Sequence, residues 1–481
     1  MTDGSVVLEN GRLPQDADAP RAVGGGTPYH EALTCLVEAE VRHCLLRDRL
    51  EDVDRCRDLD LLIHPADGRV TVAALARAGF LPRRDRRLRG KCVFLRYVHG
   101  RFYTLDVHAG FFQNGIEYMD ARRALARAER AGAGARLAPE DEFLHLLLHN
   151  LLGKKELQEK HVPRLRALHA AGLDPERLGE QARISGLRPE IDLVSASFET
   201  LLADSAAWHR MQRRVRRHLV RRPGNAIGAW RHAHGDRLRL RRRAVVLALL
   251  GPDGSGKTSF ADALEAQLRD TPLRAGRVYM GCWGHDHLPM RQARRLVPPQ
   301  VSHARMLLRR CGVPLGLTEE ERAYLVGGRG SIVRLGFAAL RYAVKNPLFH
   351  LALAAEMTFR YGRGIARSRR PLVITDRYVY DLEFRQGKIP FAHGAWHRRL
   401  WYRFFPAPDG ILYLTTPYDL VEQRKPQLDR QQFETMDRVF RRVLRPYQPL
   451  EIVSDAPPDD MVHAFLTAHW ERLLERCNRR A

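Results

Sequence analysis

Cysteine and lysine are both scarce in this sequence of 481 residues. The seven cysteines are scattered and include no C-x-x-C pair, which excludes a disulfide framework or a zinc ribbon and predicts reduced thiols. Only eight residues are lysine although Lys+Arg is 80, so arginine supplies nearly all of the positive charge. With Asp+Glu 56 the formal net charge is +24. A genome-wide codon bias and a role in phosphate binding both explain such an excess of arginine.

Long apolar runs are missing as well. The most apolar stretch, Ile332 to Phe359, is interrupted by charged residues and a proline, so we expect no membrane-spanning helix. The N-terminus contains acidic residues, glycine and proline but no basic segment followed by an apolar one, which is unlike a signal peptide. We therefore expect a cytoplasmic protein.

The rest of the composition is that of a folded protein, with 44% hydrophobic and 28% charged residues. The length suggests about two to four domains. We expect a disordered leader over residues 1–28, an α/β core over 29–135, a helical cap over 136–207, a basic connector over 208–243 and a second α/β domain over 244–481. The connector is placed where arginines crowd around Pro223-Gly224.

The strongest motif is a phosphate-binding loop. Residues 251–258 match G-x-x-x-x-G-K-[ST], follow the apolar stretch Val245–Leu250 and precede a helix-forming segment. Backbone N–H groups of such a loop bind phosphate oxygens at a helix N-terminus. Lys257 is expected to reach the β- and γ-phosphates, and the Thr258 hydroxyl to ligate Mg²⁺. The residues predicted to bind the nucleotide are Gly251, Gly254, Ser255, Gly256, Lys257 and Thr258.

A second apolar strand ends in a carboxylate. Residues 371–375 precede Asp376, which is predicted to hold Mg²⁺ through water. Arg377 is a candidate for neutralising a second phosphate group, although a salt bridge at the strand end explains the same two residues. Glu356 and Arg360, one helical turn apart, either line an acceptor pocket or form a surface ion pair.

These landmarks resemble thymidylate kinase. The loop, the triplet Asp376-Arg377-Tyr378 and the later segment Pro408–Leu414 occur in the order of that family, over about residue 243 to the C-terminus. The resemblance implies a P-loop nucleoside monophosphate kinase fold, in which helices flank a parallel sheet, with ATP and Mg²⁺ as cofactors.

The resemblance also implies roles for single residues. Asp253 would contact the acceptor sugar or the metal shell, and Arg377 would hold the acceptor phosphate. A mobile lid would supply a basic side chain, with Arg424 first, to stabilise the transferring phosphoryl group. The lid candidates, all of which are equally explained as solvated helix charges, are Arg424, Lys425, Arg430 and Arg438.

The segment from Arg277 to Lys345 is longer and more basic than its counterpart in ordinary thymidylate kinases. Because the acceptor pocket would be built there, thymidylate itself is not established as the substrate. Cys282, His285 and His287 lie in this segment, and we interpret them as loop residues rather than metal ligands because no partner cluster accompanies them.

The N-terminal half contains a second group of carboxylates. In a strand, Asp58 and Asp60 point to the same face. Two later strands are predicted at residues 92–98 and 102–107, and Asp106 lies in the second of them. Three such carboxylates bind Mg²⁺ in nucleotidyl transfer. The arrangement resembles the polymerase-beta-like nucleotidyltransferases, over about Tyr29 to Leu201.

This half departs from that family where a Gly-Ser pair is expected, because Leu46-Arg47-Asp48 stands there. Arg47 is a candidate phosphate ligand, and an active transferase and an inactive or regulatory domain both stay open. Glu142, His145 and His149 resemble the helical cap of one branch of the family, in which we expect the histidines to pack or contact phosphate rather than bind zinc.

The sequence therefore predicts an enzyme with two α/β domains. Its C-terminal domain would transfer the ATP γ-phosphoryl group to a nucleoside monophosphate, thymidylate-like, or to a related phosphorylated small molecule. One alternative is a kinase for a sugar phosphate or a nucleic-acid end. Another is a nucleotide-regulated protein whose connector arginines, between Arg210 and Arg243, bind nucleic acid or acidic lipid. Association into a homodimer is left open.

Overall fold

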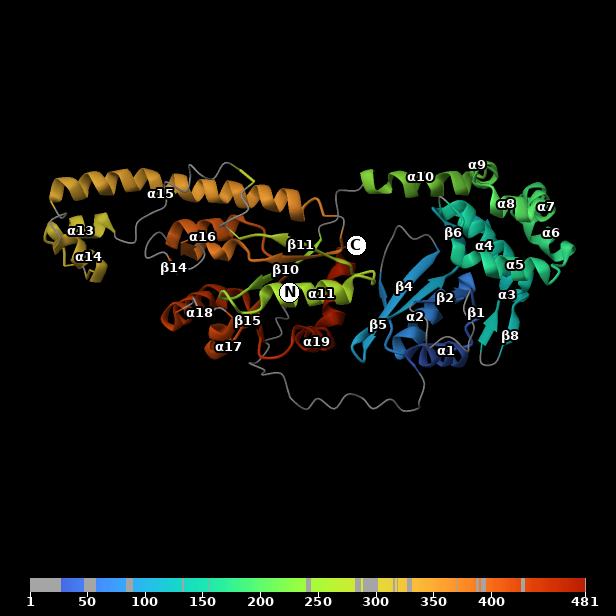
Figure 1. The fold of residues 1–481 in the computed structure, drawn as a ribbon, viewed down its shortest axis with the longest axis horizontal. Coiled ribbons are helices and arrows are strands. Elements are labelled where there is room, and N and C mark those ends of the chain that lie inside the picture. Colours follow the sequence, from blue (N-terminus) through green and yellow to red (C-terminus); the bar gives the residue numbers. More distant parts are fainter. Residues whose placement is uncertain are drawn as a thin grey trace, which may run out of the picture.

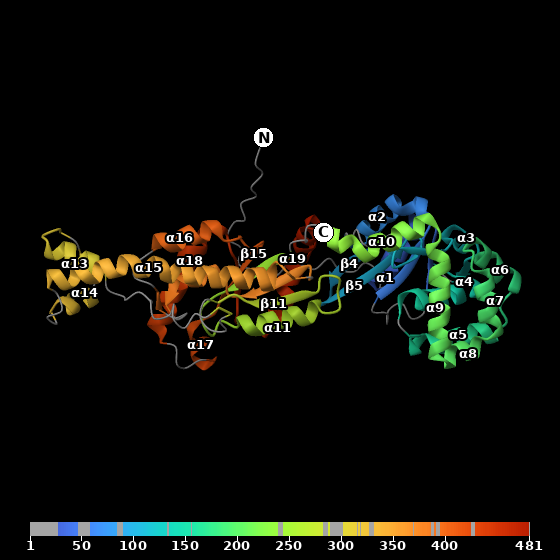
Figure 2. The same ribbon diagram turned by 90° about the horizontal axis from the view of Figure 1, so that it is seen from above.

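The computed structural model describes residues 27–46, 58–83, 90–131, 134–154, 156–238, 244–281, 287–288, 302–314, 316–317, 319–326, 331–368, 370–385, 389–390, 395–424 and 429–480. Within these ranges the molecule is elongated. The elements up to α10 lie on one side and those from β10 onward on the other (Figures 1 and 2).

The N-terminal sheet has the strand order β3-β4-β5-β2-β1-β9-β8. Its strands are β1 (His43–Leu45), β2 (Asp58–Ile63), β3 (Leu81–Arg83), β4 (Lys91–Val98), β5 (Arg101–His108), β8 (Glu129–Ala131) and β9 (Gly134–Arg136). Helices α1 (Pro28–Glu38) and α2 (Gly68–Arg77) share a core with the apolar side chains of β2. Strand β2 runs parallel to β5, with Asp60 opposite Asp106. The strands predicted at residues 92–98 and 102–107 are confirmed as β4 and β5.

A helical unit follows this sheet. It begins with the hairpin of β6 (Phe111–Gln113) and β7 (Ile116–Met119) and contains α3 (Ala121–Ala126), α4 (Pro139–Gly153), α5 (Val162–Ala170), α6 (Pro175–Ile184), α7 (Arg188–Ala196), α8 (Phe198–Ala203), α9 (Ser205–Val220) and α10 (Pro223–Leu238). Trp208, Met211, Val215 and Leu219 of α9 belong to the same apolar core as α4. The helical unit therefore continues past residue 207, and the first half of the predicted connector is a packed amphipathic helix.

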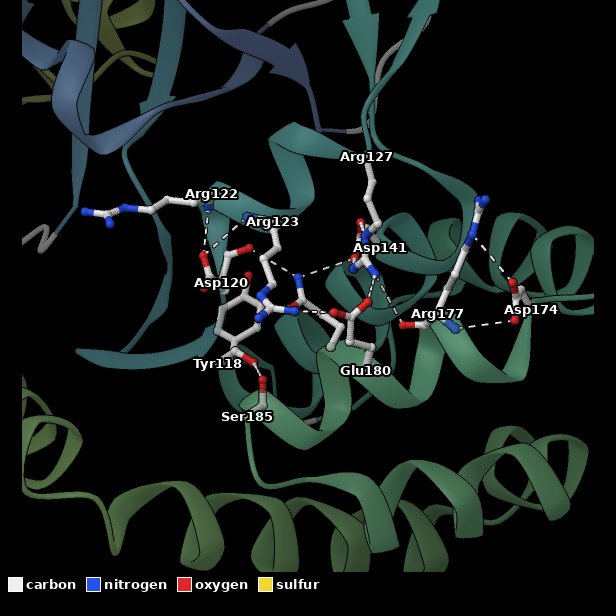
Figure 3. A network of polar contacts seen from close by, with 11 residues as sticks. Tyr118, Asp120, Arg122, Arg123, Arg127, Asp141, Asp174, Arg177, Glu180 and Ser185 are labelled. Carbon is white, nitrogen blue, oxygen red and sulfur yellow. Dashed lines mark hydrogen bonds and ion pairs between the residues drawn. The ribbon is translucent and has the colours of Figure 1, made fainter.

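A buried carboxylate ties this unit together (Figure 3). Arg127, after α3, donates to both oxygens of Asp141 on α4, from Nη2 at 2.7 Å and from Nε at 3.1 Å. Its third nitrogen lies 3.3 Å from Glu180 on α6, and Ser185 donates to the backbone oxygen of Tyr118 at 2.7 Å. Because a buried carboxylate is costly unless paired, this arginine fixes how α4 and α6 lie.

The C-terminal sheet has the order β11-β12-β10-β15-β16, and all its strands are parallel. They are β10 (Val245–Leu250), β11 (Ala275–Tyr279), β12 (Leu372–Asp376), β15 (Gly410–Thr415) and β16 (Leu450–Val453). Alternate residues of β10 belong to two separate cores, one on each face. Burial on both faces explains why this strand is a continuous apolar run.

Helices cover both faces of that sheet. They are α11 (Lys257–Leu268), α15 (Ile332–Arg360), α16 (Ala395–Phe404), α17 (Tyr418–Arg424), α18 (Arg430–Leu444) and α19 (Pro458–Arg479), with a hairpin of β13 (Phe384–Arg385) and β14 (Ile389–Pro390). Two short helices, α13 (His303–Arg310) and α14 (Glu319–Tyr324), lie beside the end of α15 that is away from the sheet (Figure 1). The predicted parallel sheet flanked by helices is confirmed. Among the described helices, α15 included, none has the length and apolar composition that crossing a bilayer requires.

Helix α19 contacts both halves of the chain. Its Phe465 packs edge-to-face on Phe260 of α11, with ring centroids 5.9 Å apart. Trp470 meets Phe102 of β5 in the same way at 6.2 Å. At its end, Asn478 donates to the backbone oxygen of Pro82 at 2.8 Å. One helix therefore joins the helix after the phosphate-binding loop to the N-terminal sheet.

We expect Trp470→Ala to lower the free energy of unfolding by about 3–5 kcal/mol, because it removes a large buried side chain between the two halves. Thr467→Ala, at an exposed position of the same helix, should change it by less than about 0.5 kcal/mol. Urea unfolding followed by far-ultraviolet circular dichroism measures both values. Equal midpoints for the two variants would show that α19 does not join the halves.

Candidate functional site

The phosphate-binding loop lies between β10 and α11, as predicted. Two of its glycines are required by geometry. A Cβ on Gly251 would lie 2.5 Å from the backbone oxygen of Leu414 in β15, and one on Gly256, whose φ is +80°, would lie 2.7 Å from Ser454 Oγ after β16. Neither position has room for a side chain. The loop is therefore pressed against the ends of two neighbouring strands.

Lys257 begins α11 and is buried. Its ammonium donates to the backbone oxygens of Gly251 at 2.9 Å and Pro252 at 2.6 Å. Burial, and after it the charge of Arg377, lowers the pKa of Lys257 to about 8 from its ordinary value of 10.5. A bound phosphate would replace these two carbonyl oxygens, because a phosphate oxygen is a stronger hydrogen-bond acceptor for the same ammonium.

Asp376 ends β12 beside the loop. It lies opposite Leu249 of β10 on one side and Tyr279 of β11 on the other. Its carboxylate is 3.6 Å from Arg277. Thr258, in the first turn of α11, is exposed. A hydroxyl and a carboxylate are hard oxygen ligands of the kind that Mg²⁺ prefers, so these two residues fit the predicted metal.

Arg377 joins the loop to the segment after β12. Its φ is +68°, a left-handed conformation, and its backbone N–H donates to Leu249 at 3.0 Å. Its guanidinium donates to Asp253 of the loop and, at 2.8 Å, to Asp381. The carboxylate of Asp381 raises the pKa of Arg377. Both terminal nitrogens therefore contact carboxylates, and the role of Arg377 in holding an acceptor phosphate stays a prediction.

Asp381 is a site residue that the sequence reasoning missed. It is fully buried, and burial raises its pKa while the charge of Arg377 acts in the opposite direction. The only local signal is its spacing of four residues from Arg377. That spacing alone does not show burial, because the residues covering Asp381 come from distant parts of the chain.

Arg424, at the end of α17, lies beside the loop. Its Nη1 donates to Ser454 Oγ at 3.3 Å, and the same atom would be 3.6 Å from a Cβ on Gly256. Of the other predicted lid residues, Lys425 lies outside the described residues. Arg430 pairs with Glu434 on the exposed face of α18, and Arg438 is exposed there.

Glu356 and Arg360 form a buried ion pair rather than a surface pair. Arg360 Nε lies 2.6 Å from Glu356 Oε1, and Arg360 also donates to the backbone oxygen of Gly281. Glu356 accepts from the backbone N–H groups of His287 at 2.9 Å and Leu288 at 2.8 Å. The pair therefore anchors Gly281, His287 and Leu288 to α15. Cys282 and His285 lie outside the described residues.

A second cluster lies in the N-terminal sheet. Side-chain atoms of Asp60, Asp106 and His108 lie within 4.8 Å of one another, and Lys91 of β4 makes an ion pair with Asp106. Asp58 was predicted as a metal ligand but is exposed at the first residue of β2 and lies outside this group. The three-carboxylate set is therefore not assembled in the described residues, while Asp60 and Asp106 do come together. Arg47 lies outside them.

The two cap histidines lie on α4. His145 is buried, and its Nδ1 lies 3.1 Å from the hydroxyl of Tyr118. The ring of His149 lies near that of His145 in a tilted arrangement, with ring centroids 5.7 Å apart. Glu142 makes an ion pair with Arg164. These contacts are those of packed residues.

No protein-family model matches this sequence, and no curated protein matches it either. Among solved structures, similar chains include TT1252 from Thermus thermophilus, with 15% identity over 48% of this chain and 98% of that one, and a TM-score of 0.25. Shikimate kinase from Acinetobacter baumannii, in complex with shikimate, has 14% identity over 48% of this chain and 96% of that one, and a TM-score of 0.22. TM-scores this low do not establish a shared fold. The P-loop fold of the C-terminal unit is therefore assigned from the geometry of its loop and its parallel sheet.

The lowered pKa of Lys257 predicts a pH dependence. Between pH 8 and about 10.5 the unfolded chain keeps a proton that the folded chain has released, so the contribution of Lys257 to the free energy of unfolding rises with pH. Relative to Lys257→Met, the wild type should gain up to about 1.4 kcal/mol per pH unit across this window. Urea unfolding at pH 7.5, 9 and 10 measures the difference. Lys160→Met, at an exposed lysine, should show a constant difference, and a constant difference for Lys257→Met would contradict the assignment.

Proposed function

We propose that the C-terminal unit is an ATP-dependent kinase that transfers the γ-phosphoryl group to a small-molecule acceptor, with Mg²⁺ as cofactor. The observation that carries the proposal is the convergence of Lys257, Thr258, Asp376 and Arg424 on one loop at the carboxyl ends of β10, β12 and β16. Phosphoryl transfer needs positioned charges rather than a covalent intermediate. Lys257 would bind the phosphates, Thr258 and Asp376 would hold Mg²⁺, and Arg424 would neutralise the transferring group.

The first acceptor we propose is a nucleoside monophosphate, thymidylate-like, or a related phosphorylated small molecule. It is supported by the thymidylate kinase resemblance and by the contact of Arg377 with Asp253 of the loop. For such an acceptor, the phosphate would have to displace a carboxylate from Arg377.

A second acceptor class is favoured by the same contacts. Because Asp253 and Asp381 already contact Arg377, the group presents carboxylate oxygens that suit an uncharged hydroxyl-bearing molecule better than a dianion. Asp253 would then accept a hydrogen bond from the acceptor hydroxyl.

We also propose that the N-terminal unit is nucleotidyltransferase-like. The support is the placement of Asp60 opposite Asp106 on parallel strands β2 and β5.

Purified full-length protein should phosphorylate at least one acceptor in a screen with ATP labelled at the γ-phosphate. The screen compares nucleoside monophosphates, sugar phosphates, uncharged polyols and short RNA and DNA ends. Lys257→Ala should lower the rate by at least about 100-fold, because it removes the cation from the phosphates. An unchanged rate in that variant would refute the kinase assignment.

We expect Arg424→Ala to lower kcat by about 10²- to 10³-fold with a smaller change in KM for ATP, because its charge is needed most as the phosphoryl group transfers. The matched control is Arg472→Ala, at an exposed position of α19, which should keep wild-type kcat. Steady-state kinetics with the acceptor found in the screen measures both. An equal kcat for the two variants would contradict the proposed role of Arg424 in phosphoryl transfer.

A further inference from the structure

Helix α15 has an exposed side that is apolar. Five large apolar residues recur along it at intervals of three, four and eight residues, which places them on one face of the helix. They are Val333, Phe337, Leu340, Leu348 and Leu351, and we call them the apolar row. All five side chains are exposed, that of Phe337 at 72%. The exposed face of a helix in a globular protein is normally polar or charged, so the apolar row needs a partner.

The opposite side of α15 is already packed. Phe349, Leu353 and Met357 belong to the core on one face of the C-terminal sheet. Leu335, nearer the start of the helix, is buried, and α13 packs on α15. Figures 1 and 2 show the N-terminal half of α15 extending past the sheet. The apolar row is therefore the side of the helix that the described parts of the protein leave exposed.

Basic residues lie beside the apolar row. Arg334, Arg341 and Lys345 are spaced by seven and four residues, so they form a second row along the same helix, which we call the basic row. At about 100° of rotation per residue, the basic row borders the apolar row on the side of Phe337. Residues 332–355 include no aspartate or glutamate. The exposed side of α15 thus combines apolar area with positive charge.

This combination favours a lipid surface over a second copy of the chain. A two-fold contact through this side would bring the basic rows of both copies to one interface, where like charges repel each other. An anionic phospholipid surface complements both rows, because acyl chains accept apolar side chains and headgroups attract arginine and lysine. The charges along α15 that are incompatible with a membrane-spanning helix fit a helix that lies in the plane of the interface.

We propose that α15 binds an anionic phospholipid surface. The helix lies in the plane of the interface, with its apolar row toward the acyl chains and its basic row at the headgroups. The inference does not depend on the proposed kinase activity, because it concerns the exposed side of a helix that contributes no residue to the phosphate-binding loop.

The test is co-sedimentation of the full-length protein, without nucleotide, with sucrose-loaded vesicles. One set of vesicles is phosphatidylcholine alone, and in the other about one-third of the lipid is phosphatidylglycerol. We expect binding to the anionic vesicles that weakens between about 50 and 500 mM salt, because salt screens the headgroup charge. Binding to the neutral vesicles should be at least about 10-fold weaker. Absence of binding to the anionic vesicles would overturn the proposal.

A first pair of variants tests the apolar row. Phe337→Gln combined with Leu340→Gln should lower binding to the anionic vesicles by at least about 10-fold, because it removes apolar area from the interface. The matched control is Val37→Gln combined with Leu193→Gln, at exposed apolar residues of α1 and α7, which should bind like the wild type. Since all four side chains are exposed, both variants should keep the wild-type melting temperature.

A second pair tests the basic row. Arg334→Gln combined with Arg341→Gln should lower binding to the anionic vesicles by about 10-fold, because two charges near the headgroups are lost. The matched control is Arg213→Gln combined with Arg217→Gln, at exposed arginines of α9, which should bind like the wild type. Binding that is lost in this control and kept in the α15 variant would assign the lipid contact to α9 and overturn the proposal.

Sedimentation equilibrium without lipid tests self-association through the apolar row. We expect the wild type and the variant carrying Phe337→Gln and Leu340→Gln to have the same mass. A dimeric wild type that becomes monomeric in this variant would assign the apolar row to a second copy and overturn the lipid assignment. Equal vesicle binding by the wild type and this variant would overturn it as well.

Discussion

The parallel register of β10 with β12 is the constraint on which the candidate kinase site depends. It places Asp376 opposite Leu249, one residue before the end of β10, so that the carboxylate and the phosphate-binding loop emerge at the same edge of the sheet. Since β15 and β16 run parallel to the same strand, their ends supply Leu414 and Ser454 beside the loop. A shift of one residue in this register would turn Asp376 to the other face of the sheet.

Charge around the loop is balanced by groups from separate segments. The ammonium of Lys257 contacts backbone carbonyls, the guanidinium of Arg377 contacts two carboxylates, and Arg424 contacts a hydroxyl. Carbonyl and hydroxyl contacts are weaker than ion pairs. Lys257 and Arg424 are therefore the cations most readily transferred to a phosphate, whereas Arg377 is held as a structural link between the loop and η7 (Val379–Glu383).

Helix α19 gives the two halves a shared element. One face of α19 packs on α11, and another face contacts β4 and β5. The helix after the phosphate-binding loop and the N-terminal sheet are therefore connected by packed side chains of one helix, in addition to the chain connection through α10. The cluster of Asp60, Asp106 and His108 lies on strands of that sheet.

The parallel sheet was implied by the resemblance to thymidylate kinase, whereas local sequence was sufficient for the phosphate-binding loop and for the strands around residues 92–107, 245–250 and 372–376. These features depend on apolar periodicity and on glycines within a few residues of one another. The tertiary structure alone decided that Asp381 contacts Arg377, that Glu356 and Arg360 are buried, that α9 packs into the cap, and that His108 and Lys91 join Asp60 and Asp106. Each of these pairings depends on burial or on strand order between segments far apart in the chain, and neither property is encoded in the spacing of neighbouring residues.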